Sequence, residues 1–200
     1  MTTDAGRRTV MRLSLLAAAA HLAPQGAARG TAGGQDPKQR RTPMGDAPRD
    51  FDFLIGSWKV RHRRLKERLA HSTEWEEFDG TCTMRPLLGG FGNVDDNVLE
   101  LPGGTYRGVG LRSFDPATKS WAIWWLDSRD PHVLDVPVIG RFQDGVGTFV
   151  AKDTLRGRPI VMKFVWSHIT PASAVWEQSF SPDEGKTWEM NWHMDFTRTA

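Results

Sequence analysis

Ten short stretches of alternating polar and apolar residues run from Trp58 to Arg198, and they constrain the fold more than any other feature of the sequence. Successive side chains of a strand point to opposite faces, so this period of two predicts strands that are buried on one face. Turn residues separate the stretches, and this is typical of sequential hairpins. The predicted strands begin near Trp58, Thr73, Gly92, Thr105, Ser120, Leu134, Gly145, Pro159, Ser173 and Thr187.

The two ends of this pattern predict a sheet that closes on itself. The first strand follows Gly56 and opens with Trp58, and the last ends at Arg198. With an even number of strands, the last can pair antiparallel with the first, and the indole of Trp58 would stack on the guanidinium of Arg198. The sequence therefore predicts an all-β fold, a single up-and-down antiparallel β-barrel of about ten strands, with Trp58 and Arg198 as its structural floor.

Side-chain parity predicts which residues face the interior. On the first strand, Trp58 places His62 and Arg64 inside. If Arg198 also points inward, the same rule places inside Phe196, Met194, Trp192, Met190 and Trp188. It leaves Asn191 and His193 facing water.

The middle strands are assigned from their apolar faces. Trp166 lies on the apolar face of residues 160–168, and Trp125 and Asp127 share the predicted inner face of residues 121–127. In residues 121–126 both faces are apolar, so one must pack outside the barrel wall or line a contact. A homodimer is one such contact.

Aromatic residues and charge divide the 200-residue chain into two parts. All nine Trp and all ten Phe lie at or beyond Phe51, so residues 51–200 are the predicted folding unit. Residues 1–50 carry a net charge of +4, and the remainder carries −2. A barrel of net negative charge is a poor match for a phosphate backbone, so we expect no nucleic-acid partner. Cys82 is the only cysteine, which excludes an intrachain disulfide.

The N-terminal residues have the order of a targeting segment. Residues 1–28 place Arg7 and Arg8 before a short apolar run, Leu13–Ala20, and a group of small residues. This order predicts a secretory signal peptide, and the run is too short for a transmembrane segment. The paired arginines resemble a twin-arginine signal, with the general secretory route as the alternative. We expect a periplasmic or extracellular protein, or a cytoplasmic one if the N-terminus is not a signal peptide. Residues 29–50 read as a flexible linker.

Several longer motifs resemble a known family. They are FDFLIGSW, RPLLGGFGNVDDN, YRGVGLRSFDPATKSWAIWW, PVIGRF, GRPIVMKFVWS, VWEQSFSPDEGKTWEMNW and MDFTR. Together they are similar to a group of bacterial calycin-like proteins catalogued as a domain of unknown function. The resemblance implies a lipocalin-like or nitrobindin-like barrel over residues 51–200 and implies no particular reaction, because a fold does not define an activity.

The predicted interior favours a ligand-binding function. Its aromatic and methionine side chains suit a small, mainly apolar or aromatic molecule, which His62 and Arg64 would orient through a polar group. The predicted ligand-binding residues are His62, Arg64, Trp125, Asp127, Trp166, Trp192 and Met194. The sequence does not identify the ligand, the oligomeric state or the export route.

Two alternatives remain open. Some nitrobindin-like barrels bind haem through a late-strand histidine, so a haem-binding barrel with peroxidase- or isomerase-type activity is the second hypothesis. The counterpart of that histidine here, His193, is predicted to face solvent, which argues against this hypothesis. A cofactor-independent enzyme that uses His62 and Asp127 for proton transfer is the third. We expect no metal site and no cofactor, because zinc, phosphate-loop and dinucleotide motifs are missing. The acidic residues 93–97 read as a strand end or turn, and Ser181–Trp188 as a structural hairpin turn.

Overall fold

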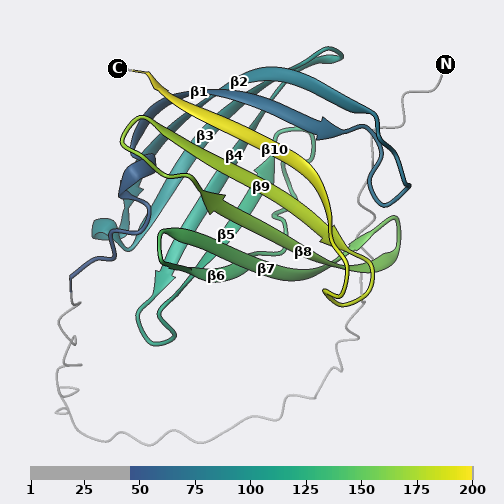
Figure 1. Cartoon of the computed structure of the whole chain (residues 1–200). Coiled ribbons are helices and arrows are strands. Elements are labelled where there is room, and N and C mark those ends of the chain that lie inside the picture. Colours follow the sequence, from purple (N-terminus) through teal and green to yellow (C-terminus); the bar gives the residue numbers. More distant parts are fainter. Residues whose placement is uncertain (1–45, 200) are drawn as a thin grey trace, which may run out of the picture. The chain divides into compact units, whose positions relative to one another are not determined.

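The first and last strands lie side by side in the computed structural model, which describes residues 46–199 (Figure 1). Each strand pairs antiparallel with its neighbours in the chain, and β10 pairs with β1 to close the barrel. The predicted fold class is therefore confirmed. The elements are η1 (Asp52–Leu54), β1 (Gly56–Leu65), β2 (Trp75–Leu87), η2 (Leu88–Gly90), β3 (Gly92–Leu101), β4 (Gly104–Asp115), β5 (Ser120–Asp127), β6 (Val138–Gln143), β7 (Val146–Leu155), β8 (Arg158–Ser167), β9 (Ser173–Ser181) and β10 (Glu189–Thr199).

The seam between β1 and β10 has the register that closure requires. Trp58 pairs with Arg198, His62 with Met194, and Arg64 with Trp192. β1 therefore begins at the floor of the barrel and ends at the opposite end, which we call the mouth. Because the strands alternate in direction, the loops after the odd-numbered strands lie at the mouth and the others at the floor.

The sixth strand begins later than its sequence pattern suggests. It was expected near Leu134 but starts at Val138, directly after Pro137. Proline has no N–H to donate to a neighbouring strand, which limits pairing at that point. β5 and β6 consequently share only three residue pairs, and Leu134 is joined to Leu126 of β5 by an isolated bridge.

A β-bulge in β10 corrects the predicted parity at one end of that strand. The register shifts between Met190 and Trp192, so Asn191 turns inward, is fully buried, and accepts a 2.8 Å hydrogen bond from Nε2 of Gln178. Trp188 precedes the strand, is exposed, and donates its indole N–H to the carbonyl of Gly185. The expectation that Trp188 points inward and Asn191 outward was wrong, because a bulge reverses the alternation.

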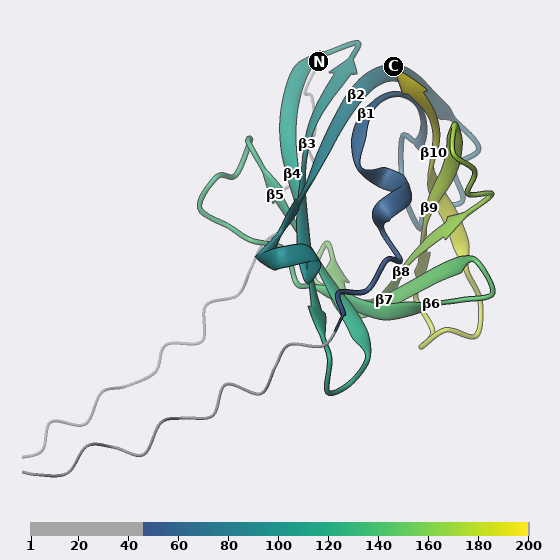
Figure 2. The same ribbon diagram turned by 90° about the vertical axis from the view of Figure 1, so that its left-hand side faces the viewer.

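The segment before β1 fills the floor end of the barrel. Figure 2 looks onto this end and shows η1 within the ring of strands. Phe51 is 2% exposed, and its ring contacts those of Trp121, Phe142, Phe149 and Trp166. The indole of Trp121 donates to Asp50, and that of Trp58 donates to the carbonyl of Leu54. These bonds fix the entering segment inside the floor.

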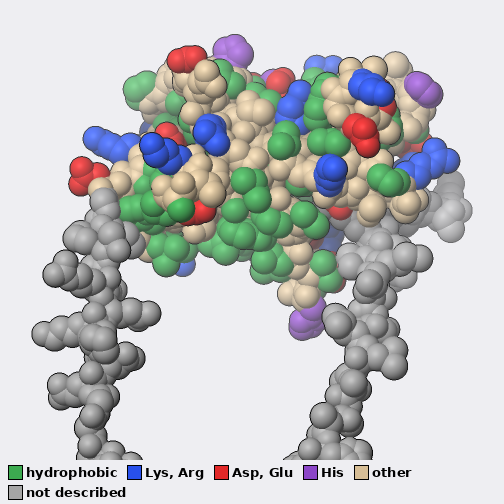
Figure 3. All heavy atoms as spheres, turned by 90° about the horizontal axis from the view of Figure 1, so that it is seen from below, with side chains coloured by type: hydrophobic (Ala, Val, Ile, Leu, Met, Phe, Trp, Pro, Cys, Tyr) green, Lys and Arg blue, Asp and Glu red, His purple; other side chains and the backbone are tan. Residues whose placement is uncertain are grey.

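Part of the outer wall is apolar. Leu134, Val136, Ile139 and Val150 are each 45–51% exposed, and they belong to β6, β7 and the loop before β6. The face drawn in Figure 3 carries a broad group of hydrophobic side chains.

The predicted signal peptide, residues 1–28, lies outside the described residues, as does most of the predicted linker, residues 29–50. Within the part of the chain that the structure describes, no helix has the length and hydrophobicity needed to span a bilayer.

Candidate functional site

The floor is held by one arginine that reaches three backbone carbonyls. The guanidinium carbon of Arg198 lies 4.2 Å from the centroid of the Trp58 ring. Its Nη1 donates to the carbonyl of Ile55 and its Nη2 to that of Phe53, while Nε donates to Pro171. Gly56 has a φ of 115°, and a Cβ there would meet Nη1 at 2.8 Å, so glycine leaves the space that the guanidinium occupies.

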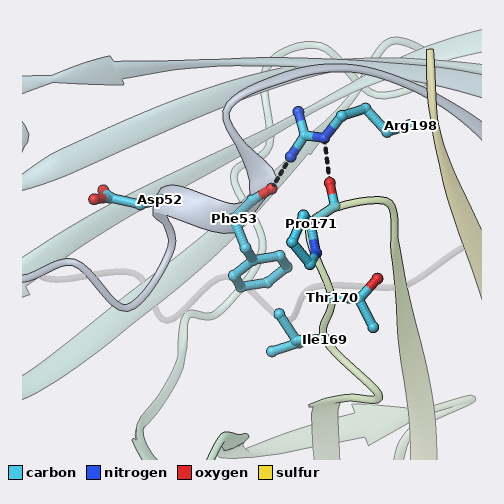
Figure 4. A pocket seen from close by; sticks show the side chains of 6 residues that line it. All are labelled: Asp52, Phe53, Ile169, Thr170, Pro171 and Arg198. Atoms are coloured by element: carbon cyan, nitrogen blue, oxygen red, sulfur yellow. Dashed lines mark hydrogen bonds between the residues drawn. The ribbon is translucent and has the colours of Figure 1, made fainter. Parts of the chain in front are cut away.

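A shallow groove of about 580 Å³ lies beside this clamp (Figure 4). Its lining is Asp52, Phe53, Ile169, Thr170, Pro171 and Arg198. The guanidinium in this groove already donates to backbone carbonyls, as Figure 4 shows for Phe53 and Pro171. Asp52, the other charged residue of the lining, pairs with Arg49. The groove therefore lacks an uncommitted charged group.

Inward-facing side chains differ in exposure between the two halves of the barrel. In the floor half, Trp58, Trp121 and Trp166 are each at most 2% exposed. Toward the mouth, the inward-facing residues that remain partly exposed are Arg64, Trp125, Asp127, Phe164, Trp192 and Met194. Solvent therefore reaches several inward-facing side chains toward the mouth, whereas the three tryptophans of the floor half are closed to it.

The structure thus divides the predicted ligand-binding residues. Arg64, Trp125, Asp127, Trp192 and Met194 belong to the partly exposed group toward the mouth. Trp166 instead packs into the floor core, where its ring lies 5.5 Å from that of Phe53 and 5.1 Å from that of Phe196.

His62 lies below the mouth as a buried, neutral side chain. It is 2% exposed, stacks on Phe78 at 4.6 Å, and its Nδ1 accepts a 3.3 Å hydrogen bond from the indole of Trp192. Burial lowers its pKa to about 3, and the positive charge of Arg64 adds to this effect. Gly80 makes room for the ring, because a Cβ there would meet Nε2 at 2.8 Å. The neutral imidazole of His62 therefore accepts the indole N–H of Trp192 and orients that ring.

Arg64 forms the rim above this histidine. Its guanidinium stands 5.2 Å from the ring centroid of Trp192 and 5.4 Å from that of Phe78. Nε and Nη2 both donate to the same oxygen of Glu76, across the pair of β1 and β2. The carboxylate thus holds the guanidinium over the two rings.

Across the mouth, Asp127 performs the same task for a second arginine. Both of its oxygens accept from Arg129, whose guanidinium lies 3.7 Å from the ring centroid of Tyr106. Burial opposes ionisation of Asp127, but the hydrogen bonds from Arg129 outweigh it and lower its pKa. The neighbouring Trp125 lies flat on Gly108, where a Cβ would meet the indole at 2.0 Å.

A buried polar cluster lies on β3 and β4, and its position differs from the prediction. Residues 93–97 were expected at a strand end or turn, but they lie within β3, and Asp95 faces inward at 3% exposure. Its carboxylate pairs with Arg112 and accepts from Asn97 at 2.5 Å and from the backbone of Gly110 at 2.9 Å. Arg112 in turn lies 5.0 Å from the ring centroid of Phe51.

Sequence reasoning missed this cluster and the mouth residues Tyr106 and Arg129. The missing step for Tyr106 was to apply parity to β4, where Tyr106, Gly108, Gly110 and Arg112 alternate inward. Glycines that face a large or charged residue on the next strand are a usable signal, because they provide the space it needs. Nothing in the sequence pattern identified Arg129, which lies in a loop.

The alternative sites are placed as follows. His193 lies on the outer face, between Glu177 and Asp195, at 3.1 Å from each. Among residues 46–199, no three His, Cys, Asp or Glu side chains gather to hold a metal ion. Within the same residues, no hydrogen bond joins His62 to Asp127, because the first accepts from Trp192 and the second from Arg129.

These observations define a closed ten-stranded barrel with a sealed floor and an aromatic, arginine-rimmed mouth. Residues 49–136, which include β1 to β5, match the family model described as "Protein of unknown function (DUF1579)". The resemblance to a family of unknown function, expected from the sequence motifs, is confirmed by this match. A search of curated proteins found no match.

Solved structures similar to this chain include two barrels at low sequence identity. One is described as the S-type phycobiliprotein lyase CPES from Guillardia theta, at 12% identity and a TM-score of 0.50, covering 75% of this chain and 90% of that one. The other is described as EF1p2_mFAP2b bound to DFHBI, at 10% identity and a TM-score of 0.42, covering 76% of this chain and 98% of that one. At these identities the similarity concerns the fold alone.

Proposed function

We propose that the protein is an exported barrel that binds a small, mainly apolar or aromatic molecule in the mouth half of its lumen. The carrying observation is the partial exposure of inward-facing aromatic side chains in a closed barrel, among them Trp125, Phe164 and Trp192. Large apolar side chains that water reaches inside a barrel gain free energy when a ligand replaces that water. The leader residues Arg7 and Arg8 support export.

The aromatic groups toward the mouth are held in fixed orientations by their neighbours. The ring of Trp176 meets those of Trp192 and Phe164 edge-on, at 5.9 and 4.8 Å. Trp192 is oriented by its bond to His62, and Trp125 by its contact with Gly108. Fixed rings lose little conformational entropy on binding, which favours a stacked ligand.

Binding of a fluorescent aromatic probe tests this function. N-phenyl-1-naphthylamine is neutral, and 8-anilinonaphthalene-1-sulfonate is the same molecule with a sulfonate; both fluoresce more strongly in apolar surroundings. We expect saturable 1:1 binding of at least one probe, with energy transfer from tryptophan. In the double variant Trp125→Ala/Trp192→Ala, affinity should fall about tenfold or more, because two stacking surfaces are lost.

The matched control is Trp188→Ala, which removes an exposed indole on the outside of the barrel. It should leave affinity unchanged. Failure of both probes to bind the wild-type protein, or equal affinity in the wild type and the lumen double variant, would contradict the proposed function.

A further inference from the structure

The mouth carries three arginines. Arg64 is the last but one residue of β1, Arg68 lies in the loop that follows, and Arg129 lies in the loop after β5. The guanidinium of Arg68 lies 5.8 Å from the ring centroid of Trp192, the same ring that Arg64 covers. Arg129 covers Tyr106. Each arginine therefore faces an aromatic ring of the mouth.

All three positive charges act on the same group, the hydroxyl of Tyr106. Burial raises the pKa of Tyr106, whereas Arg129, Arg64 and Arg68 all act electrostatically in favour of its ionised form, opposed by the carboxylate of Asp127. Charges act on a common group in this way only when they lie near it. Three guanidinium groups and one carboxylate therefore act on the Tyr106 hydroxyl, and the guanidinium of Arg129 lies directly over its ring.

Donors in this region remain without acceptors among residues 46–199. Arg64 uses Nε and Nη2 for Glu76, and Arg129 uses Nε and Nη2 for Asp127, so Nη1 of each has no acceptor among these residues. The hydroxyl of Tyr106, on a residue only 8% exposed, also has no hydrogen-bond partner in the described chain. Three uncommitted donors, two of them on guanidinium groups, suit an acceptor that carries negative charge.

We propose that the mouth receives an anionic group, so that the ligand is an aromatic or otherwise planar apolar molecule bearing one carboxylate- or sulfonate-sized anion. This inference rests on the proposed function and specifies its ligand class. The apolar body enters the lumen between Trp125 and Trp192, and the anion remains at the rim, where it accepts from Nη1 of Arg64 and of Arg129 and from the hydroxyl of Tyr106. Glu76 and Asp127 hold the two guanidiniums by hydrogen bonds and also offset their positive charge. Gln or Asn at these positions keeps an oxygen that accepts from the guanidinium and removes only the negative charge.

The two naphthalene probes distinguish this inference from the proposed function, because they differ by one sulfonate. We expect the wild-type protein to bind the anionic probe at least tenfold more tightly than the neutral probe in low salt, with the difference shrinking as salt screens the charges. Equal affinity for the two probes would overturn the anion site and leave lumen binding intact. Binding of neither probe would overturn the proposed function itself.

Charge-removing variants should move the affinity for the anionic probe in opposite directions. Arg64→Gln and Arg129→Gln should each weaken it by about three- to tenfold, whereas Glu76→Gln and Asp127→Asn should strengthen it by a similar factor. Tyr106→Phe should weaken it through loss of one donor. In every variant, affinity for the neutral probe reports whether the lumen is still intact.

Arg63→Gln is the matched control, because Arg63 is the neighbour of Arg64 on β1 and covers an aromatic ring, Trp75, on the outside of the barrel. It should change neither affinity. An equal loss in Arg63→Gln and Arg64→Gln would show that the probe responds to surface charge in general, and this would overturn the site. Carboxylate variants that weaken the binding of the anionic probe would also overturn it.

Discussion

The floor half and the mouth half of this barrel are built from similar side chains but differ in how closely those side chains are packed. At the floor, Phe51 packs among tryptophans, and the indole N–H groups of Trp58 and Trp121 donate to a backbone and a carboxylate oxygen. At the mouth, arginines cover the rings of Trp192 and Tyr106, and Trp192 and Trp125 remain partly exposed. The comparison teaches that aromatic content alone does not indicate a pocket. What decides is whether another segment of the chain already occupies the space.

The largest test of this difference removes one ring from each half. Phe51→Ala should lower the free energy of unfolding by about 3–5 kcal/mol, because it empties a fully packed position. Trp125→Ala should cost about 1–2 kcal/mol, although it deletes a larger ring, since water already reaches part of that side chain. Urea denaturation of both variants measures the contrast, and equal losses would show that the mouth is as tightly packed as the floor.

The buried polar cluster on β3 and β4 gives a second test. Asp95→Ala leaves the buried guanidinium of Arg112 without its carboxylate and should cost about 3 kcal/mol. The double variant Asp95→Leu/Arg112→Met removes both charges and should be more stable than Asp95→Ala. Denaturation midpoints decide between these outcomes. A double variant less stable than the single would mean that the ion pair itself, rather than its completeness, stabilises the barrel.

A third test uses the pH dependence of stability at the boundary of the mouth. The pKa of His62 is about 3 in the folded protein and about 6.5 in an unfolded chain, so only the unfolded state takes up a proton between these values. Stability from this residue is therefore complete above pH 6.5 and is lost as pH falls toward 3, by up to about 1.4 kcal/mol per pH unit.

In His62→Gln this part of the pH dependence should disappear, which denaturation at several pH values would reveal as a shallower slope than in the wild type. His132→Gln, in an exposed loop, is the control and should retain the wild-type slope. An unchanged slope in His62→Gln would show that the histidine is protonated in the folded barrel.

The smallest expected effect lies in the hairpin at Ser181–Trp188, outside both halves of the lumen. Asp183 accepts from the backbone and side chain of Thr187 and from Ser181, and these bonds lower its pKa to about 2. Asp183→Asn should lower the melting temperature slightly at neutral pH. The difference from wild type should be full above about pH 3.8 and vanish as pH falls through about 2. Probe affinity should not change, and a change would link this hairpin to the ligand site.

Period-two alternation was sufficient to predict the barrel and its closing seam, because a strand with one buried face leaves a direct record in the sequence. It also placed His62, Arg64 and Trp125 on inward faces. Parity failed at Asn191, where a bulge left no sequence signal.

The division of the lumen could not be predicted in the same way. Trp166 and Trp192 are both inward-facing tryptophans in alternating strands, and nothing local separates them. Their difference arises because Phe51, from a segment before the first strand, occupies only one end of the barrel. Contacts between residues so distant in the chain are not encoded in the pattern of either strand.

The seam between β1 and β10 has a consequence for how the chain reaches its native state. β1 is the first strand to be synthesised, yet one of its two neighbours is the last, so its unpaired edge stays available to other chains until β10 arrives. Because Arg198 lies on β10, its hydrogen bonds to the carbonyls of Phe53 and Ile55 also form only when this last strand pairs. A ribosome-bound chain that lacks this strand holds an open, sticky sheet, and the barrel can close only once this strand is present.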